Sequence, residues 1–389
     1  MSEIKVNSIK GVSASTAAIT VDNTAGTCTA NLTNKPNRNL IINGAMQVAQ
    51  RGTSNTTNGR GTVDRFANYY NGADEAPTQA QVDVASGTTP YTSGFRKALK
   101  ITNGNQTSGA GSTDYIWIQY KLEAQDIANS GWNYVSSSSF ITLSFWVKSS
   151  VAQDFKGYLR TKDGTSQMYP FATGSLTADT WTKITKTIPG NSNLQFDNDV
   201  EQGLEINIAP FFGTDLTNNA TTEDAWAAYV SANRTKDNTS TFWTTNDATF
   251  EVTGLQLEVS DHATDFEHRS FAQELTLCQR YFQKYVHIAN TSCIGTGLIW
   301  SGTEVRTPFM YLQEMRSAPS FTSSTASTFQ ASNGDQSRTA SALSLSSICK
   351  THAIIIMTTS SGLTQSNPIF MDNANNGGTD SFFALDSEL

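Results

Sequence analysis

The chain has 389 residues and a formal net charge of −8, and only 15% of its residues are charged, against roughly 25% in an average soluble protein. The acidic balance excludes nucleic acid as an expected partner, because a phosphate-binding surface needs clustered Lys and Arg. No apolar stretch follows Met1–Lys10 and no apolar run reaches about 18 residues, so we expect neither a secretory signal nor membrane insertion.

Residues 1–38 differ from the rest of the chain. Spaced apolar residues such as Ile4, Val6 and Ile9 stand among polar ones, and Ala17, Ile19 and Val21 alternate with polar neighbours. Such short strands cannot bury an apolar face alone, because too little surface leaves water to offset the chain entropy. One interpretation is a flexible tail. We favour an oligomeric β stalk or docking segment.

Residues 39–268 show the period-two pattern of half-buried antiparallel strands and are expected to form one large β-sandwich. Apolar residues alternate with polar ones at Ile116–Leu122, Ile141–Val147 and Leu204–Ile208. Phe250 and Val252 occupy even positions whereas Leu255 and Leu257 occupy odd ones, so a β-bulge at Thr253-Gly254 is needed to keep one face inward. A short helix is expected at Glu223–Val230.

A connecting amphipathic helix is predicted within residues 269–290. Ser270 and Gln273 fit a capping box at its start. Steps of four, three, four and three place five residues on one stripe, and these are the candidates for an oligomer seam or a packing face: Phe271, Leu275, Cys278, Phe282 and Tyr285. The stripe suits a coiled coil or packing on a sheet equally, since two and a half heptads are short for a coiled coil.

Residues 291–389 are expected to form a second, β-sandwich-like module. Gly297–Trp300, Phe309–Leu312 and Ile354–Met357 are short apolar runs typical of strands. Phe321–Ser347, by contrast, is rich in Ser and Thr and predicts exposed loops or weakly patterned strands.

The sequence contains no recognisable catalytic, cofactor or metal motif. The four cysteines (Cys28, Cys278, Cys293 and Cys349) form no CxxC pair, and the four histidines stand in no ligand spacing. His268 could bind a metal with a nearby carboxylate, but we favour a hydrogen-bonded role at a domain junction. Asp197-Asn198-Asp199 offers hard oxygen ligands for calcium, although the triplet alone is a weak signal. We therefore expect no enzyme, no cofactor and no metal.

Seven tryptophans include two candidates for glycan contact. Trp117 and Trp146 each lie opposite the aliphatic stripe of their strand. An exposed indole ring can stack on the apolar face of a sugar. The alternative, which is stronger for any single tryptophan, is that each packs beneath a second layer.

Several short blocks, in this order, resemble a domain that recurs in bacteriophage tail-fibre proteins. The blocks are Asn39–Met46, Gln50–Gly52, Thr62–Phe66, Thr142–Ser150, Thr180–Lys183, Thr253–Val259, Ala263–Ser270 and Glu274–Lys284. Asp265 departs from the family's commoner proline. Met315–Phe321 is similar to a motif of the family's C-terminal modules, and Met1–Asn7 resembles the N-termini of fibres from phages of marine bacteria.

The resemblance implies a jelly-roll, carbohydrate-binding-module-like domain in a structural virion protein, made in the host cytoplasm, and it supplies no catalytic residue. We expect a tail-fibre-type homotrimer that mediates host attachment. Residues 1–38 would dock onto another virion protein, and the C-terminal module would contact a host-surface glycan or outer-membrane component through its loops. A capsid or neck decoration or adaptor subunit is the alternative, and a glycan-cleaving tailspike enzyme is a third.

Overall fold

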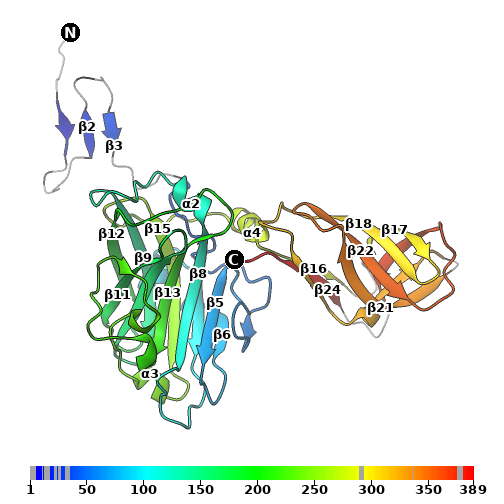
Figure 1. The fold of residues 1–389 in the computed structure, drawn as a ribbon, viewed down its shortest axis with the longest axis horizontal. Coiled ribbons are helices and arrows are strands. Elements are labelled where there is room, and N and C mark those ends of the chain that lie inside the picture. Colours follow the sequence, from blue (N-terminus) through cyan, green and yellow to red (C-terminus); the bar gives the residue numbers. More distant parts are fainter. Residues whose placement is uncertain are drawn as a thin grey trace.

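The computed structural model describes residues 6–10, 12, 18–21, 24, 28–30, 36–288, 293–334, 336–374 and 380–389. The chain is mainly β, as the sequence predicted. Figure 1 shows three parts in chain order: a small N-terminal sheet, a large two-sheet body, and a C-terminal unit that projects from one side of this body.

The N-terminal sheet has three short antiparallel strands, as expected from the alternation in residues 1–38. They are β1 (Ser8–Ile9), β2 (Ile19–Val21) and β3 (Cys28–Ala30), in the order β1-β2-β3. Val6, Ile9 and Val12 are exposed. Apolar surface therefore stays in water in the single chain, which is the condition under which a stalk or docking segment would gain from a partner. Ile4 and Ala17 lie outside the described residues.

The large body is the expected jelly-roll β-sandwich, built from two six-stranded antiparallel sheets between which the chain passes repeatedly. The first sheet has the order β14 (Ala227–Ala228), β11 (Gln167–Ser175), β10 (Asp154–Thr161), β13 (Gln202–Phe212), β8 (Tyr115–Glu123), β5 (Phe66–Asn71). The second has the order β12 (Thr182–Pro189), β9 (Phe140–Ser149), β15 (Thr249–Glu258), β7 (Lys97–Thr102), β6 (Thr78–Asp83), β4 (Ser54–Asn55). Short helices in the connections are α1 (Thr89–Thr92), α2 (Ala124–Ala128) and α3 (Thr241–Thr244), with 3-10 turns at Thr214–Leu216 and Ser231–Asn233.

The core lies between the two sheets. Each of the three predicted alternating strands is present, as β8, β9 and β13, and buries its apolar face there. The predicted bulge is also confirmed, because the register of β15 against β9 shifts between Thr253 and Gln256. Gly254 adopts a φ of 65° at this point, and all four flanking apolar side chains, Phe250, Val252, Leu255 and Leu257, are buried.

The predicted helix at Glu223–Val230 is wrong. The segment instead carries the edge strand β14, whose Ala227 pairs with Met168 of β11. The Trp226 indole donates to the Pro189 carbonyl at 2.7 Å. Pairing with a strand about 60 residues earlier therefore overrides the local helical spacing.

The predicted connecting helix is present for only half of its length. Helix α4 spans Phe271–Gln279, with the expected capping box between Ser270 and Gln273. The chain then enters strand β16 (Phe282–His287), which pairs with β24 (Ser381–Asp386) near the C-terminus.

The five-residue helical stripe therefore does not exist as one surface. Phe271 is exposed, Leu275 half-buried and Cys278 buried on the helix. Phe282 and Tyr285 lie on the strand, and their odd spacing points them to opposite faces. Sequence spacing alone could not reveal this, since the competing partner is about 100 residues away.

The C-terminal unit is β, as expected, but six of its strands close into a barrel instead of packing as a sandwich. Around the barrel they are β17 (Cys293–Ser301), β18 (Glu304–Met310), β22 (His352–Thr359), β21 (Ser337–Ser346), β20 (Phe329–Ser332) and β23 (Pro368–Asn373). A three-stranded sheet, β16-β24-β19 (β19 at Ser320–Ser323), lies between barrel and sandwich, and a 3-10 turn spans Ala326–Thr328. Much of Phe321–Ser347 is thus strand. Among the described residues, no helix is both long and apolar enough to cross a membrane.

Candidate functional site

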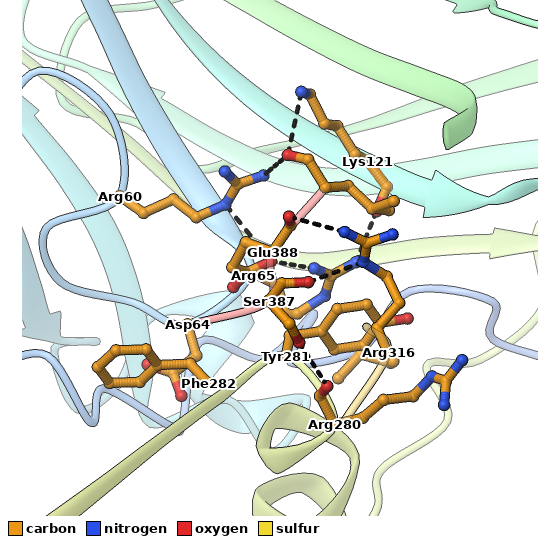
Figure 2. A network of polar contacts seen from close by, with 12 residues as sticks. Arg60, Asp64, Arg65, Lys121, Arg280, Tyr281, Phe282, Arg316, Ser387 and Glu388 are labelled. Atoms are coloured by element: carbon orange, nitrogen blue, oxygen red, sulfur yellow. Dashed lines mark hydrogen bonds and ion pairs between the residues drawn. The ribbon is translucent and has the colours of Figure 1, made fainter. Parts of the chain in front are cut away.

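The junction between sandwich and barrel brings together three of the sequence blocks that resemble tail-fibre domains, together with Arg316 of the motif Met315–Phe321. The three blocks are Gln50–Gly52, Thr62–Phe66 and Glu274–Lys284. Figure 2 shows Arg60, Asp64 and Arg65 from the sandwich, Arg280–Phe282 from the start of the connection, Arg316, and the C-terminal residues Ser387 and Glu388. We call this set, with Arg51, Lys121, Glu123 and Leu389, the clamp.

Glu388 is the centre of the clamp. Its side chain is only 4% exposed and faces three arginines. It pairs with Arg65, lies 3.4 Å from Arg60 Nε and lies 3.6 Å from Arg51 Nη2. Burial alone would raise the pKa of Glu388, but Arg65, Arg60 and Arg51 together lower it below the usual value. The carboxylate is therefore charged and paired.

The arginines of the clamp also stack on aromatic rings. The Arg65 guanidinium lies 3.3 Å from the Tyr281 ring centroid, and that of Arg51 lies 3.7 Å from the Phe282 centroid. Cation–π contacts of this kind strengthen when they are removed from water. The arginines of the sandwich blocks thus pack directly on the aromatic residues of the block that follows α4.

Five further hydrogen bonds fix the ends of the clamp. Glu123, which is fully buried, accepts two hydrogen bonds of 2.8 Å from Arg280 and one of 2.6 Å from the Tyr281 hydroxyl. The Ser387 amide donates to the Tyr281 carbonyl at 2.8 Å, and Arg316 Nε donates to the Ser387 carbonyl at 2.7 Å. The C-terminal residues therefore return from the barrel to the sandwich.

The main-chain oxygen of Leu389 extends this return. It accepts from Arg60 Nη2 at 3.0 Å and from Lys121 Nζ at 3.1 Å. Two chain segments cross the junction, and each of them forms an ion pair with the sandwich. The clamp therefore holds the barrel in one orientation. The buried carboxylates of Glu388 and Glu123 are each held by arginine, so the arrangement is suited to fixing the two parts together.

A second group of matching blocks closes the sandwich itself. The Glu267 carboxylate accepts from the Asn39 amide at 2.7 Å, and Arg269 Nη1 donates to the Ile41 carbonyl at 3.1 Å. Glu274 accepts from the Asn43 amide, and Asn43 Nδ2 donates to the Val48 carbonyl at 2.8 Å. The contacts made by Glu267, Arg269 and Glu274 join the beginning of the sandwich to its end across more than 200 residues.

His268 is hydrogen-bonded, as expected, but its partners lie within the sandwich and not at a domain junction. Its Nε2 lies 2.9 Å from the Ser93 carbonyl, and its ring packs on Phe95 and Phe266. In the candidate calcium triplet, Asp199 accepts the amide of Glu201, and Asn198 accepts from Asn129. Within the described part of the chain, no three His, Cys, Asp or Glu side chains gather as a metal site would require.

The two candidate tryptophans lie on opposite outer faces of the sandwich and are not brought together. Trp117 on β8 is half-buried, with its ring centroid 4.2 Å from Tyr115 and 5.3 Å from Phe212. Arg234, from the segment after β14, lies over the ring at 5.2 Å from its centroid. This segment therefore covers Trp117 in part, as the alternative interpretation of the sequence allowed. A single ligand cannot contact both tryptophans, because the sandwich separates them.

Trp146 on β9 is half-buried too, but it lines an open hollow of about 500 Å³. Phe95 and Phe266 contribute further rings to this hollow, and Lys183 and His268 contribute polar groups. A wider groove of about 830 Å³ lies where Pro36–Arg38 pass helix α4. The hollow at Trp146 is therefore the sandwich's own candidate for a sugar.

The barrel carries exposed rings that the sequence pattern did not single out. Trp300 on β17 is 51% exposed and Phe370 on β23 is 50% exposed. Arg306, which is held by Glu304 at 2.6 Å, covers one face of the Trp300 ring at 4.0 Å from its centroid. The exposure of Phe370 could have been predicted from the sequence by the alternation along β23, because Ile369 and Met371 point inward and Phe370 points outward.

Comparison with known proteins finds likeness of structure alone. No family model matches the chain, and no curated protein matches it. Among solved structures, the enzymatically active domain of tailspike protein 4 of bacteriophage CBA120 is 9% identical with a TM-score of 0.31, covering 58% of this chain and 22% of that one. The N-terminal cellulose-binding domain of Cellulomonas fimi β-1,4-glucanase C is 11% identical with a TM-score of 0.27, covering 55% and 98%.

A structure described as that of a CBM4 is 13% identical with a TM-score of 0.28, covering 57% of this chain and 99% of that one. This chain thus spans about a fifth of the tailspike and nearly all of the two binding modules. At these identities and scores, each match concerns the fold and assigns no ligand, activity or assembly to this chain.

Proposed function

We propose that the protein is a structural virion component of the tail-fibre type that presents its C-terminal barrel to a host-surface glycan. The observation that carries this proposal is the clamp. Three of the blocks that resemble fibre domains, Gln50–Gly52, Thr62–Phe66 and Glu274–Lys284, meet at buried ion pairs that join the barrel to the sandwich. An attachment arm needs such a fixed geometry to transmit contact at its tip.

The positions of the N-terminal sheet and the barrel support attachment to the virion through residues 1–38 with the barrel facing the host. The small N-terminal sheet and the barrel project from different sides of the sandwich (Figure 1). The exposed Val6, Ile9 and Val12 of the N-terminal segment give residues 1–38 an apolar surface for a second copy or another virion protein. We propose a homotrimer attached through this segment, with the domains divided at residues 38, 268 and 290.

Immunogold labelling of phage particles tests the proposal, with one antibody raised against residues 1–38 and another against 291–389. Label from the second antibody at the free ends of tail fibres, with the first antibody excluded from intact particles, supports it. Absence of the protein from purified particles refutes the virion role, and label on the capsid or neck favours the decoration or adaptor alternative. Mass photometry of the purified protein tests the trimer, since a monomer at micromolar concentration contradicts it.

The sandwich hollow at Trp146 is a second candidate for the glycan site. It combines three aromatic rings with polar side chains, whereas the barrel offers exposed rings at its surface. Incubating the protein with host polysaccharide and assaying new reducing ends separates binding from cleavage. We expect no new reducing ends, because the two buried carboxylates of the clamp, Glu123 and Glu388, are each paired with arginine.

A further inference from the structure

The end of the barrel far from the sandwich is formed by three turns. Strand β18 runs from Glu304 to Met310, and the residues after Met310 approach the clamp, where Arg316 bonds Ser387. The opposite end therefore holds the β17–β18 turn, residues 333, 334 and 336 between β20 and β21, and the β22–β23 loop at 360–367. It is the part of the barrel most distant from the clamp along the strands.

Hydrogen bonds join these turns to one another. Gln336 Nε2 donates to Thr364 Oγ1 at 2.9 Å, the Leu363 amide donates to the Gly302 carbonyl at 3.1 Å, and Thr359 N donates to the Thr303 carbonyl at 2.9 Å. The described turns thus support each other, so the backbone at this end of the barrel is held in place before any ligand arrives. Such preorganisation lowers the entropy lost on binding.

A hollow of about 340 Å³ opens beside this end of the barrel, and we call it the Phe370 hollow. Its lining residues are Thr296, Asn333, Asn367, Pro368, Ile369 and Phe370. The half-exposed Phe370 ring lies next to Thr296, its partner across β17 and β23. The size is at the lower end of the range for small-ligand sites, about 300–1,000 Å³.

The chemistry of the lining selects a kind of ligand. An exposed aromatic face binds the apolar C–H face of a pyranose, while amide and hydroxyl groups bond to its hydroxyls. In the described chain, the side chains of Thr296 and Asn367 have no hydrogen bond to protein, so both can bond to a ligand. None of the six lining residues carries a charge, and an acidic sugar would therefore lose hydration without gaining an ion pair.

We propose that the Phe370 hollow binds one uncharged sugar unit of a surface polysaccharide, with the ring stacked on Phe370 and hydroxyls bonded by Asn367 and Thr296. This inference rests on the proposed glycan-binding function and names its site and ligand class. Leu298, which pairs with Pro368, and Trp300 continue the outer face of β17. Since four residues of a strand span about 13 Å, a chain of sugars could extend from Phe370 toward Trp300.

The test measures binding of the full-length protein to uncharged hexasaccharides of glucose, mannose, galactose and xylose and to a hexauronate, by ligand-observed NMR and calorimetry. The variants are Phe370→Ala, Asn367→Ala and Trp146→Ala. Phe271→Ala is the matched control, because Phe271 is also an exposed phenylalanine, at 56%, but lies on α4. Thermal melts establish whether each variant folds. If Phe370→Ala does not fold, the Asn367→Ala variant provides the test of the site.

We expect an uncharged hexasaccharide to bind, Phe370→Ala and Asn367→Ala to weaken it roughly tenfold, and Phe271→Ala and Trp146→Ala to leave it unchanged. Loss of binding only in Trp146→Ala overturns this inference and moves the site to the sandwich, with the proposed glycan function intact. Binding of the hexauronate alone overturns the uncharged class. Binding of no sugar by the wild-type protein contradicts both the inference and the glycan part of the proposed function.

Discussion

Replacing Glu388 by Gln tests whether ion pairing in the clamp holds the barrel on the sandwich. Glutamine keeps the volume and can still accept a hydrogen bond, but it removes the carboxylate charge that pairs with both Arg65 and Arg60. The Arg65 side chain is 1% exposed. Removing one partner of such a buried pair typically costs about 3–5 kcal/mol, because the remaining charge is left uncompensated.

The protein can limit this cost by releasing residues 387–389 from the sandwich, so that water reaches the arginines. The lost stabilisation then appears as local opening of the clamp and not as global unfolding. We expect amide exchange in the segment Ser381–Leu389 to accelerate on the order of a hundredfold, since each 1.4 kcal/mol corresponds to about a tenfold change. The Ser387 amide, which bonds the Tyr281 carbonyl, is the most direct reporter.

Hydrogen exchange with mass spectrometry makes the measurement, and small-angle scattering reports whether the barrel then samples several orientations. Glu304→Gln is the matched control, because Glu304 pairs with Arg306 at 2.6 Å on the partly exposed barrel surface. That ion pair should contribute little to stability, and its loss should leave amide exchange in the C-terminal segment unchanged. If Glu388→Gln exchanges like the wild type while remaining folded, the ion pairs do not hold the barrel and the reasoning from the clamp is wrong.

Two further changes test single features of the sandwich. Burial and, second, the nearby charge of Glu123 raise the pKa of Asp126 from 3.8 to about 6. Between pH 3.8 and pH 6 the folded protein therefore keeps a proton on Asp126 that the unfolded chain has lost. The contribution of Asp126 to the unfolding free energy falls as pH rises through this window. Asp126→Asn should raise the unfolding free energy by about 1–2 kcal/mol at pH 7.5 and change it little at pH 3.5, and an equal gain at both pH values in chemical denaturation would refute the assignment. Gly254→Ala should destabilise by about 2–4 kcal/mol, from the left-handed backbone and overpacking, because the new Cβ would lie 2.6 Å from Phe95. Gly87→Ala is its control, with a φ of 84° and open space around the added atom, and an equal loss in both variants would show that the clash contributes nothing.

Local pattern determined much of the sandwich. The period-two alternation identified β8, β9 and β13, and the change of parity around Gly254 identified a bulge, because a strand that is buried on one face tolerates no slip of register. The capping box at Ser270 was also readable, since both of its partners lie within four residues. The low charge and β-rich composition agree with the mainly β fold.

The secondary structure of segments that pair with distant parts of the chain was decided only by the tertiary structure. Phe282 and Tyr285 continue a helical spacing, yet they form a strand because β24, about 100 residues later, supplies the hydrogen bonds. The closure of the barrel is likewise a property of β17 meeting β23, which no local pattern encodes.

The candidate sites divide in the same way. The sequence singled out Trp117 and Trp146 as aromatic residues opposite an aliphatic face. It could not show that Arg234 lies over the ring of Trp117 whereas Trp146 borders a hollow. Nor could it bring Glu388 to Arg65, 323 positions away. Alternation along a strand fixes which face a side chain takes, whereas its exposure and its partners depend on what the rest of the chain places over that face.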